Sequence, residues 1–411
     1  MKLKGFQKLT LTDKAQQTWF CALKIGKPKM TQVPLKQALN RVLTEDLFAQ
    51  ESLPRFDKSA MDGFAVKSAD LAGASQSKPV ILQLTQSDFV EFKQAKEVWT
   101  GNPIPKGTDT VVMLENTEKH GEYVDVWNQL APGTNVSKVG EDLKQGDTVV
   151  KAGTRLNPYH LGLAAALGFL QLKVAEKPKI AIIATGNEIA EVGAERASNQ
   201  IYDSNKTMVG AMCQELGAET SDLGIAKDNT EEIAEKIQKA LKTHDAIITT
   251  GGTSVGGLDL VPDAVNKLGK PGVIVHGVAL RPAMPTAVGI LEGKPVLILS
   301  GNPVAAVIGF EVFGRSLICK MLGLSKPDPR PIVKAVLTRR VTSALGRKTY
   351  VRVRVIEKDG DLFAEPVSTK GSGSISTMTL SNGYVVVPEN REGIGEGETV
   401  IVQMFGVVEV A

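Results

Sequence analysis

Residues 177–326 alternate short apolar runs with longer segments of helical periodicity, and this alternation constrains the fold more than any other feature of the chain. The runs at 179–186 and 245–252 predict buried strands, and the segments 203–217 and 229–242 predict helices. Strands separated by helices pair in parallel, because each helix carries the chain back across one face of the sheet. We therefore expect a mostly parallel, three-layer α/β domain over residues 177–326.

Two further parts of the chain predict β structure. Residues 49–142 contain short strand-like runs, such as 80–85 and 110–116, which are separated by turns rich in glycine, proline and aspartate. Residues 327–411 begin within a proline-rich linker at 325–331 and return to alternating apolar runs. The sequence thus predicts a β-rich domain over 49–142 and a C-terminal β domain over 327–411.

The remaining residues predict a linker domain that is helical or extended. It comprises residues 1–48 and 143–176, which flank the β-rich domain in the sequence. Apolar residues recur at helical spacing in 11–25, 34–49 and 157–170. A multidomain chain that combines α/β and β domains is therefore expected.

Length, charge and cysteine content limit the classes of function. A chain of 411 residues suggests about two to four domains, and a net charge of +3 gives no argument for nucleic acid or a membrane as partner. The three cysteines lie far apart without metal-type spacing, and no signal peptide is recognisable. The longest apolar run, residues 161–172, is too short to span a bilayer. We expect a cytoplasmic protein.

Three glycine-rich turns follow strands of the predicted α/β domain, at 184–188, 249–257 and 299–304. In open parallel sheets ligands bind outside the carboxyl ends of the strands. Glycine lets the backbone approach a ligand closely, and successive N–H groups suit an oxyanion. A single Gly-Gly turn is usually only a tight turn, but three in one sheet favour a phosphate site. Their spacing matches neither a dinucleotide fingerprint nor a P-loop.

Acidic residues stand beside these turns. Glu188, Asp228 and Asp259 would repel a phosphate unless a hard cation lay between them, and Mg²⁺ suits carboxylates and phosphate oxygens. Asp203 is equally consistent with a helix cap, and Asp228 with a turn residue. Arg281 is the candidate cation for a phosphate, although it could also lie at the surface at a strand end.

The β-rich domain contains unusual loops of its own. The string SAMDGFAV (59–66) places an acidic residue in apolar surroundings, although Asp-Gly is also a common turn. The loops within 99–115 and the acidic turn at 139–147 are weak signals when taken singly. Together they predict a second polar surface that meets the first.

The order of these strings resembles the MoeA/gephyrin E-domain family, the molybdopterin molybdenumtransferases. The resemblance covers essentially the whole chain and rests on SAMDGFAV, TGNPIPKGTDTVVMLENT, GEDLKQGD, ATGNEI, YDSN, TTGGTSVG and LSGNPVAAVIGFEVF. It implies an elongated homodimer that inserts molybdate or tungstate into adenylylated molybdopterin and releases AMP in a Mg²⁺-dependent step. It also implies a molybdopterin adenylyltransferase as substrate donor, and an α/β domain like that of the MogA/MoaB adenylyltransferases.

The resemblance carries functional roles onto matching positions. In the β-rich and linker parts these are Asp62, Thr100 and Asp142, with the oxyanion expected near Thr100 and the Asp62 loop. In the α/β cleft, Glu188, Asp228 and Asp259 are the implied Mg²⁺ ligands and catalytic carboxylates, and Arg281 is expected to screen charge. The positions implied to bind the substrate are Asp142, Gly251, Gly252, Ser254, Gly256, Ser300, Gly301, Asn302, Pro303 and, in the C-terminal domain, Ser372.

The chain departs from the family pattern in one loop and one turn. Arg281 and Met284 stand where the family commonly has lysines, and a further family lysine corresponds to Gly277. Ser300 replaces the usual proline before Gly-Asn-Pro. Fewer lysines mean less positive charge where anions are expected, so the sequence predicts weaker capture of the oxyanion.

Two alternative functions remain open at this point. The α/β domain alone also resembles pterin-adenylylating and nucleotide-hydrolysing enzymes, but the strings at 59–66 and 99–115 argue against that reading. A non-catalytic or scaffold paralogue of the family is the other alternative. The missing lysines favour it, and the retained carboxylates weigh against it.

Overall fold

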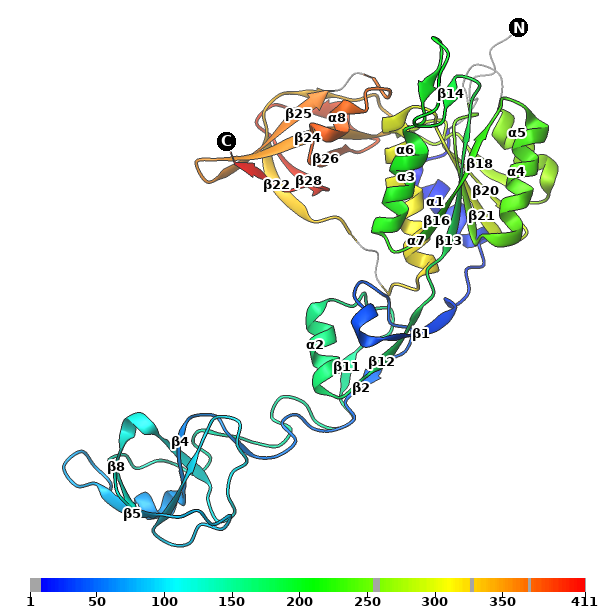
Figure 1. The fold of residues 1–411 in the computed structure, drawn as a ribbon. Coiled ribbons are helices and arrows are strands. Elements are labelled where there is room, and N and C mark those ends of the chain that lie inside the picture. The colour runs from blue at the N-terminus through cyan, green and yellow to red at the C-terminus, as the bar shows by residue number, and fades with distance from the viewer. Residues whose placement is uncertain (1–8, 254–258, 326–328, 369–370, 411) are drawn as a thin grey trace.

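The structure is a computed structural model and describes residues 9–253, 259–325, 329–368 and 371–410. The molecule is elongated, with the α/β domain and the C-terminal β domain at one end, the linker domain in the middle and the β-rich domain at the far end (Figure 1). The chain crosses the linker domain twice, once on its way to the β-rich domain and once on its way back. None of the described helices is long and apolar enough to cross a membrane.

The α/β domain contains a six-stranded sheet. In order across the sheet its strands are β16 (Glu219–Ala226), β13 (Lys179–Thr185), β17 (Ala246–Thr250), β21 (Lys294–Leu299), β20 (Ala287–Leu291) and β18 (Gly272–His276). The pairings β13–β16, β13–β17 and β17–β21 are parallel, whereas β20 runs antiparallel to both β21 and β18. Every strand except β20 therefore runs in the same direction, which confirms the predicted mostly parallel sheet.

Helices cover both faces of this sheet and complete the three layers (Figure 1). One face carries α1 (Thr12–Ala22), α3 (Asn205–Glu215), α6 (Pro303–Gly309) and α7 (Arg315–Met321), with the π-helical turn η4 (Phe310–Gly314) between α6 and α7. The other face carries α4 (Thr230–Thr243) and α5 (Leu260–Leu268). The segment α1, which the sequence analysis assigns to the linker domain, packs into the α/β core, where the Trp19 Nε1–H donates to the Gly289 carbonyl at 2.9 Å.

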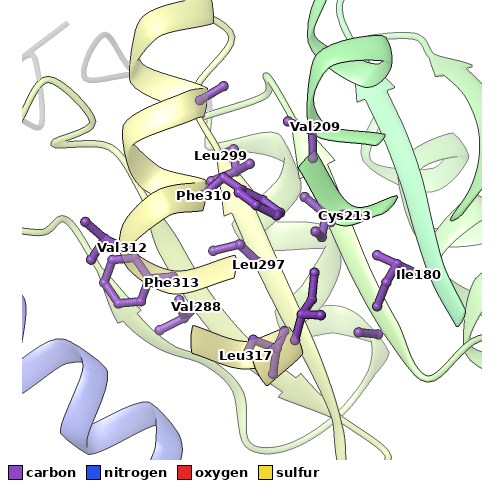
Figure 2. Close-up of a cluster of buried hydrophobic side chains, with 14 of the residues drawn as sticks. Ile180, Val209, Cys213, Val288, Leu297, Leu299, Phe310, Val312, Phe313 and Leu317 are labelled. Atoms are coloured by element: carbon purple, nitrogen blue, oxygen red, sulfur yellow. The ribbon is translucent and has the colours of Figure 1, made fainter. Parts of the chain in front are cut away.

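The two-residue period of β13 divides the core between these faces. Ile180 and Ile182 pack toward α3 and α6, whereas Ala181 and Ile183 pack toward α4 and α5. Figure 2 shows the first face, where Phe310 lies close to Leu299 and the α3 side chains. Burying such a branched or aromatic side chain contributes about 1.5–3 kcal/mol, so this packing holds the strand ends in place.

The β-rich domain is a six-stranded sheet with a small two-stranded addition. In sheet order the strands are β7 (Thr110–Met113), β4 (Gly63–Val66), β6 (Gln94–Val98), β5 (Val80–Leu84), β9 (Tyr123–Val126) and β8 (Thr117–His120), and β3 (Lys58–Ser59) pairs with β10 (Val136–Ser137). The 3₁₀ turn η2 (Ser68–Leu71) lies between β4 and β5, and η3 (Leu114–Asn116) lies between β7 and β8. The prediction of a β-rich domain is confirmed.

The linker domain is more extended than the sequence pattern indicates. It consists of β1 (Met30–Pro34) paired with β12 (Gln171–Ala175), β2 (Leu47–Phe48) paired with β11 (Thr148–Val150), and α2 (Pro158–Ala166). The helix α2 begins with a capping box in which the Asn157 side chain accepts from the His160 N–H and the His160 ring accepts from the Asn157 N–H.

The predicted helix over 34–49 is wrong. The helical structure there is limited to the single 3₁₀ turn η1 (Leu35–Gln37), and Leu47–Phe48 forms the strand β2. Asn40 has a left-handed φ of 62°, which ends any helix, and Leu43 pairs across a β-bridge with Val174. Pairing with the returning chain has overridden the helical spacing of the apolar residues.

The C-terminal domain is a closed barrel. Its ring runs through β24 (Lys348–Lys358), β25 (Asp361–Ser368), β22 (Ile332–Leu337), β28 (Thr399–Met404) and β26 (Gly383–Val387), which pairs again with β24. Closure removes the free edges of the sheet. The smaller elements are β23 (Val341–Thr342), β27 (Gly393–Ile394), β29 (Glu409–Val410) and α8 (Ser376–Thr379). A short strand of the α/β domain, β19 (Leu280–Arg281), pairs with β24 and joins the two domains.

Candidate active site

A cleft of about 540 Å³ lies where the strands β13, β17 and β21 end. The glycine-rich turns that follow these strands form its floor, and Glu188, Asp203 and Asp228 contribute side chains to its walls. The short strands β14 (Ile189–Ala190) and β15 (Ile201–Tyr202) rise beside it. The structure therefore gathers the three predicted turns around one cavity at the carboxyl ends of parallel strands.

The turn after β17 requires glycine at two successive positions. Gly251 and Gly252 have φ values of 89° and 64°, which other residues rarely adopt. A Cβ at Gly251 would come within 2.5 Å of the Thr185 carbonyl oxygen, and one at Gly252 within 2.5 Å of a Val261 methyl group. The backbone itself thus lines the cleft here. Ser254 and Gly256, also predicted in this turn, lie outside the described residues.

Hydrogen bonds within the turn after β21, and from α3 to this turn, fix its conformation. The Ser300 side chain is buried, and its Oγ accepts from the Asn302 N–H at 3.3 Å. The Asn205 Nδ2 group donates to the Gly301 carbonyl at 2.8 Å, which joins the turn to the start of α3. Pro303 is the first residue of α6, a position where its missing N–H costs nothing. The four predicted residues 300–303 therefore form one rigid turn.

Two of the three predicted metal ligands line the cleft. Glu188 and Asp228 are exposed there, and the Asp228 Oδ2 accepts from the Asn187 N–H at 3.1 Å. Asp259 is half-buried outside the lining, and its Oδ1 lies 3.5 Å from Nε2 of His276. Among the described residues, no three histidine, cysteine or acidic side chains gather closely enough to hold a metal ion together. Mg²⁺ commonly takes only one or two carboxylates beside substrate phosphates, so Glu188 and Asp228 still fit it.

Asp203 has a structural role that the sequence left open. It is buried, and its Oδ1 accepts from the N–H groups of Asn205 and Lys206, which caps the start of α3. Burial raises the pKa of Asp203, against the lowering effects of the hydrogen bond from the Lys206 N–H and of the Lys206 charge. The Lys206 ammonium in turn pairs with Glu191 and Asp222, at 2.9 and 2.8 Å.

A second cavity of about 290 Å³ lies between the α/β domain and the barrel, and we call it the arginine cavity. Arg281 lines it from the α/β side, and Arg347 and Arg352 line it from the barrel side, together with Ser372. The arginine cavity adjoins the cleft, because Ser300 and Asn302 line both.

The barrel loop at Ser372 is fixed to the α/β domain, because the Val304 N–H donates to its carbonyl at 3.0 Å. Arg347 and Arg352 were missed by the sequence analysis. The only local signal was the place of Arg352 in the apolar run TYVRVRVIE (349–357), of which a strand usually buries one face, and Arg347 lies outside that run. Arg352 is indeed buried, and burial lowers its pKa, although a guanidinium stays charged at physiological pH.

The structure describes Met284 and Gly277, two positions at which the resemblance leads us to expect lysine. Met284 is half-buried and lines the arginine cavity. Gly277 is buried with a left-handed φ of 86°, so a lysine there would be strained whatever space it had.

Asp62 and Thr100 form a pair at the far end of the molecule. The Thr100 N–H and Oγ1–H both donate to the Asp62 Oδ1 at 2.7 Å, and these bonds lower the pKa of Asp62. The pair lies just before the start of β4, in the domain farthest from the α/β sheet (Figure 1). Asp142 is exposed near the junction with the linker domain, where its N–H donates to the Leu53 carbonyl. Within one chain these residues do not reach the cleft.

The fold and the cleft place the chain among multidomain α/β proteins whose ligand site lies at the carboxyl ends of parallel strands. Three family models match it in succession. Residues 10–168 match the MoeA N-terminal region (domain I and II), residues 181–320 match a domain described as "Probable molybdopterin binding domain", and residues 334–405 match the MoeA C-terminal region (domain IV).

Known proteins similar to the chain agree with these models. A molybdopterin molybdenumtransferase of Haemophilus influenzae is 34% identical over 90% of this chain and 93% of its own length. Molybdopterin molybdenumtransferase 2 of Mycobacterium tuberculosis is 35% identical over 89% of this chain and 92% of its own length. The crystal structure of the molybdopterin biosynthesis MoeA protein of Pyrococcus horikoshii OT3 superposes with a TM-score of 0.84 at 29% identity, covering 97% of this chain and all of that one. The chain belongs to the MoeA family.

Proposed function

We propose that this protein inserts molybdate or tungstate into adenylylated molybdopterin and releases AMP. The observation that carries the proposal is the pair of adjoining cavities, one lined by glycine turns and carboxylates and the other by arginines, which share Ser300 and Asn302. Relatives named molybdopterin molybdenumtransferase match about nine-tenths of the chain. Two such adjoining cavities suit a reaction in which one binds the phosphates of the substrate and the other binds the oxyanion that reacts with it.

The cleft is the proposed place for the phosphates of the substrate. Its glycine turns carry no side chains at Gly251 and Gly252, so phosphate oxygens can approach the backbone there closely. Glu188 and Asp228 would hold Mg²⁺, which would supply positive charge beside the phosphates. The rigid turn at 300–303 orients the bound substrate, and positioning of this kind contributes much of the rate in phosphoryl chemistry.

The arginine cavity is the proposed place for the oxyanion. Guanidinium groups bind tetrahedral oxyanions through paired N–H donors, and Arg281 from the α/β domain and Arg347 from the barrel both line this cavity. This replaces the expectation that the oxyanion binds near Thr100, because Asp62 accepts both Thr100 bonds as a carboxylate of lowered pKa and would repel an anion.

The proposed assembly is a homodimer in which a second copy of the chain brings its Asp62–Thr100 pair to the cleft. The support is the separation of that pair from the cleft within one chain (Figure 1). An elongated molecule with polar surfaces at both ends suits an arrangement with twofold symmetry. We further propose a molybdopterin adenylyltransferase as substrate donor and the cytoplasm as compartment.

The test is an assay of AMP release from adenylylated molybdopterin by the purified protein, with molybdate and tungstate titrated side by side and Mg²⁺ varied. Release that requires an oxyanion and Mg²⁺ is the expected result. Absence of release at any oxyanion concentration would favour a scaffold paralogue. Release without an oxyanion, or hydrolysis of ATP, would favour a nucleotide-hydrolysing enzyme.

A further inference from the structure

A buried charged cluster, separate from both cavities, crosses the seam between the α/β domain and the barrel. Glu311 lies in the π-helical turn η4 with only 7% of its side chain exposed. Its carboxylate accepts from Arg315 Nε at 3.1 Å, from Arg330 Nε at 3.1 Å and from Arg330 Nη2. Arg330 thus forms a bidentate pair with the Glu311 carboxylate, which is the strongest geometry for such an ion pair.

The cluster is electrically balanced and joins three parts of the molecule. Glu215, at the end of α3, lies 3.5 Å from Nη1 of Arg330 and 3.8 Å from Nη2 of Arg315. Arg330 lies two residues before β22, the first barrel strand, whereas Glu311 and Arg315 belong to the α/β domain. Burial opposes the charge of Arg330, yet the hydrogen bonds and the charge of Glu311 raise its pKa. Breaking a buried pair leaves the other charge uncompensated, so this contact resists separation of the domains.

The π-helical turn presents Glu311 at this place. Single π turns within α-helices are rare and occur often at functional positions. Gly314 permits the turn, because a Cβ there would come within 2.5 Å of the Phe310 ring. The Gln16 side chain of α1 donates to the Val312 carbonyl of this turn. Phe310 and Phe313 are anchored in the core (Figure 2).

Aromatic side chains connect the cluster with the arginine cavity. Tyr384 of the barrel is almost fully buried in the α/β core, and burial raises its pKa, with a further increase from the charge of Glu311 and an opposing effect from Arg330. It packs edge-on against Tyr350 with ring centroids 6.1 Å apart, and against Phe405 at 4.6 Å. Tyr350 also lines the arginine cavity, two residues from Arg352. A shift of the cluster would therefore be transmitted to the cavity wall.

We infer that Glu311, Arg315 and Arg330 form a clamp that fixes the barrel against the α/β domain. Through Tyr384 and Tyr350 this clamp sets the position of the cavity wall at Arg352 relative to Ser300 and Asn302, whereas Arg281 is held beside the barrel by the pairing of β19 with β24. Glu311 and Arg330 are positioning residues, because they contact neither cavity themselves. The second half of this inference rests on the proposed function, since it assumes that the arginine cavity binds the oxyanion. The first half, the clamp itself, does not.

The test measures the domain spacing and oxyanion binding separately. Spin labels go on cysteines introduced at the exposed Lys239 of α4 and Lys358 of β24, in a Cys21→Ser background, with the buried Cys213 and Cys319 left in place. The labelled chain is diluted with unlabelled protein so that distances within one chain dominate. Glu311→Gln removes the charge, and Arg330→Lys keeps the charge but loses the two-donor grip.

The exposed pair Arg391–Glu398 of the same barrel supplies the control, as Glu398→Gln. We expect both clamp variants to broaden the electron–electron distance distribution and to weaken binding of inorganic tungstate by at least tenfold, with a threefold or smaller change in turnover at saturating oxyanion. The control should change neither. Arg330→Lys leaves the net charge of the cluster unchanged, so this variant still tests the clamp if Glu311→Gln fails to fold.

Unchanged distance distributions in a folded clamp variant would overturn the clamp. A broadened distribution with unchanged tungstate affinity would overturn its role in positioning the cavity. If the wild-type protein binds no tungstate, the proposed oxyanion site fails, and the distance measurement still decides the clamp by itself.

Discussion

The cleft and the arginine cavity adjoin each other but are built in opposite ways. The cleft is made of backbone turns that follow consecutive strands of one sheet, and Gly251 and Gly252 shape it by lacking side chains. The arginine cavity is made of long side chains that two domains bring together, Arg281 from the α/β domain and Arg347 from the barrel. A cleft of the first kind depends on the local fold. A cavity of the second kind depends on how two domains sit against each other.

The largest effect should come from closing the cleft. Gly252→Ala would place a methyl group against Val261 and force a left-handed φ, so we expect loss of more than about a hundredfold in turnover and a destabilisation of at least the roughly 1–2 kcal/mol that a left-handed residue costs. Gly293→Ala is the matched control, since Gly293 also has a positive φ but meets nothing within 4 Å. The control should lower the melting temperature and leave turnover intact. Equal turnover in the two variants would contradict a backbone-built cleft.

Complementation tests whether the far end of the molecule belongs to the cleft of another copy. Asp62→Ala and Asp228→Ala chains should each be inactive, and mixed chains allowed to exchange should regain up to about a quarter of wild-type activity, because about half of the dimers then carry one complete site. Activity of the mixture is measured against each variant incubated alone. A monomer by light scattering, or no regain despite proven exchange, would rule out the shared site.

Removing one arginine should affect binding more than turnover. A hydrogen bond to a charged group contributes about 1.5–3 kcal/mol, so Arg347→Ala should raise the apparent oxyanion constant by roughly ten- to a hundredfold. Turnover at saturating oxyanion should change little. Arg391→Ala removes an arginine from the exposed surface of the same barrel and serves as the control. A fall in turnover with an unchanged oxyanion constant would place the oxyanion elsewhere.

The smallest expected effect is a gain. Met284→Lys adds a charge at the wall of the arginine cavity and should lower the oxyanion constant by up to about tenfold, since an exposed ionic contact contributes at most about 1 kcal/mol and a partly desolvated one somewhat more. Gly277→Lys should instead destabilise the protein, because of its left-handed φ. If Met284→Lys lowers the melting temperature and leaves the constant unchanged, Met284 serves only packing.

The same contrast explains what the sequence could and could not predict. The strands, the glycine turns and the cleft followed from local patterns, because each turn comes directly after its strand. The helix expected over 34–49 failed, since Leu43 pairs with Val174, a residue far along the chain. Arg347 and Arg352 were missed because their position against Arg281 depends on the packing of the barrel, which no local pattern encodes. The role expected for Asp259 beside the cleft stays a prediction, as it faces His276.

Tungsten is the most direct probe of the central claim, that the arginine cavity holds the oxyanion beside the phosphate cleft. Crystals grown or soaked with tungstate, at a concentration that saturates turnover, would be measured at the tungsten absorption edge, where anomalous scattering locates the metal. The account predicts one peak per chain between Arg281 and Arg347, lost in Arg347→Ala and kept in Arg391→Ala. A peak beside Asp62 and Thr100, or none in the arginine cavity, would contradict it.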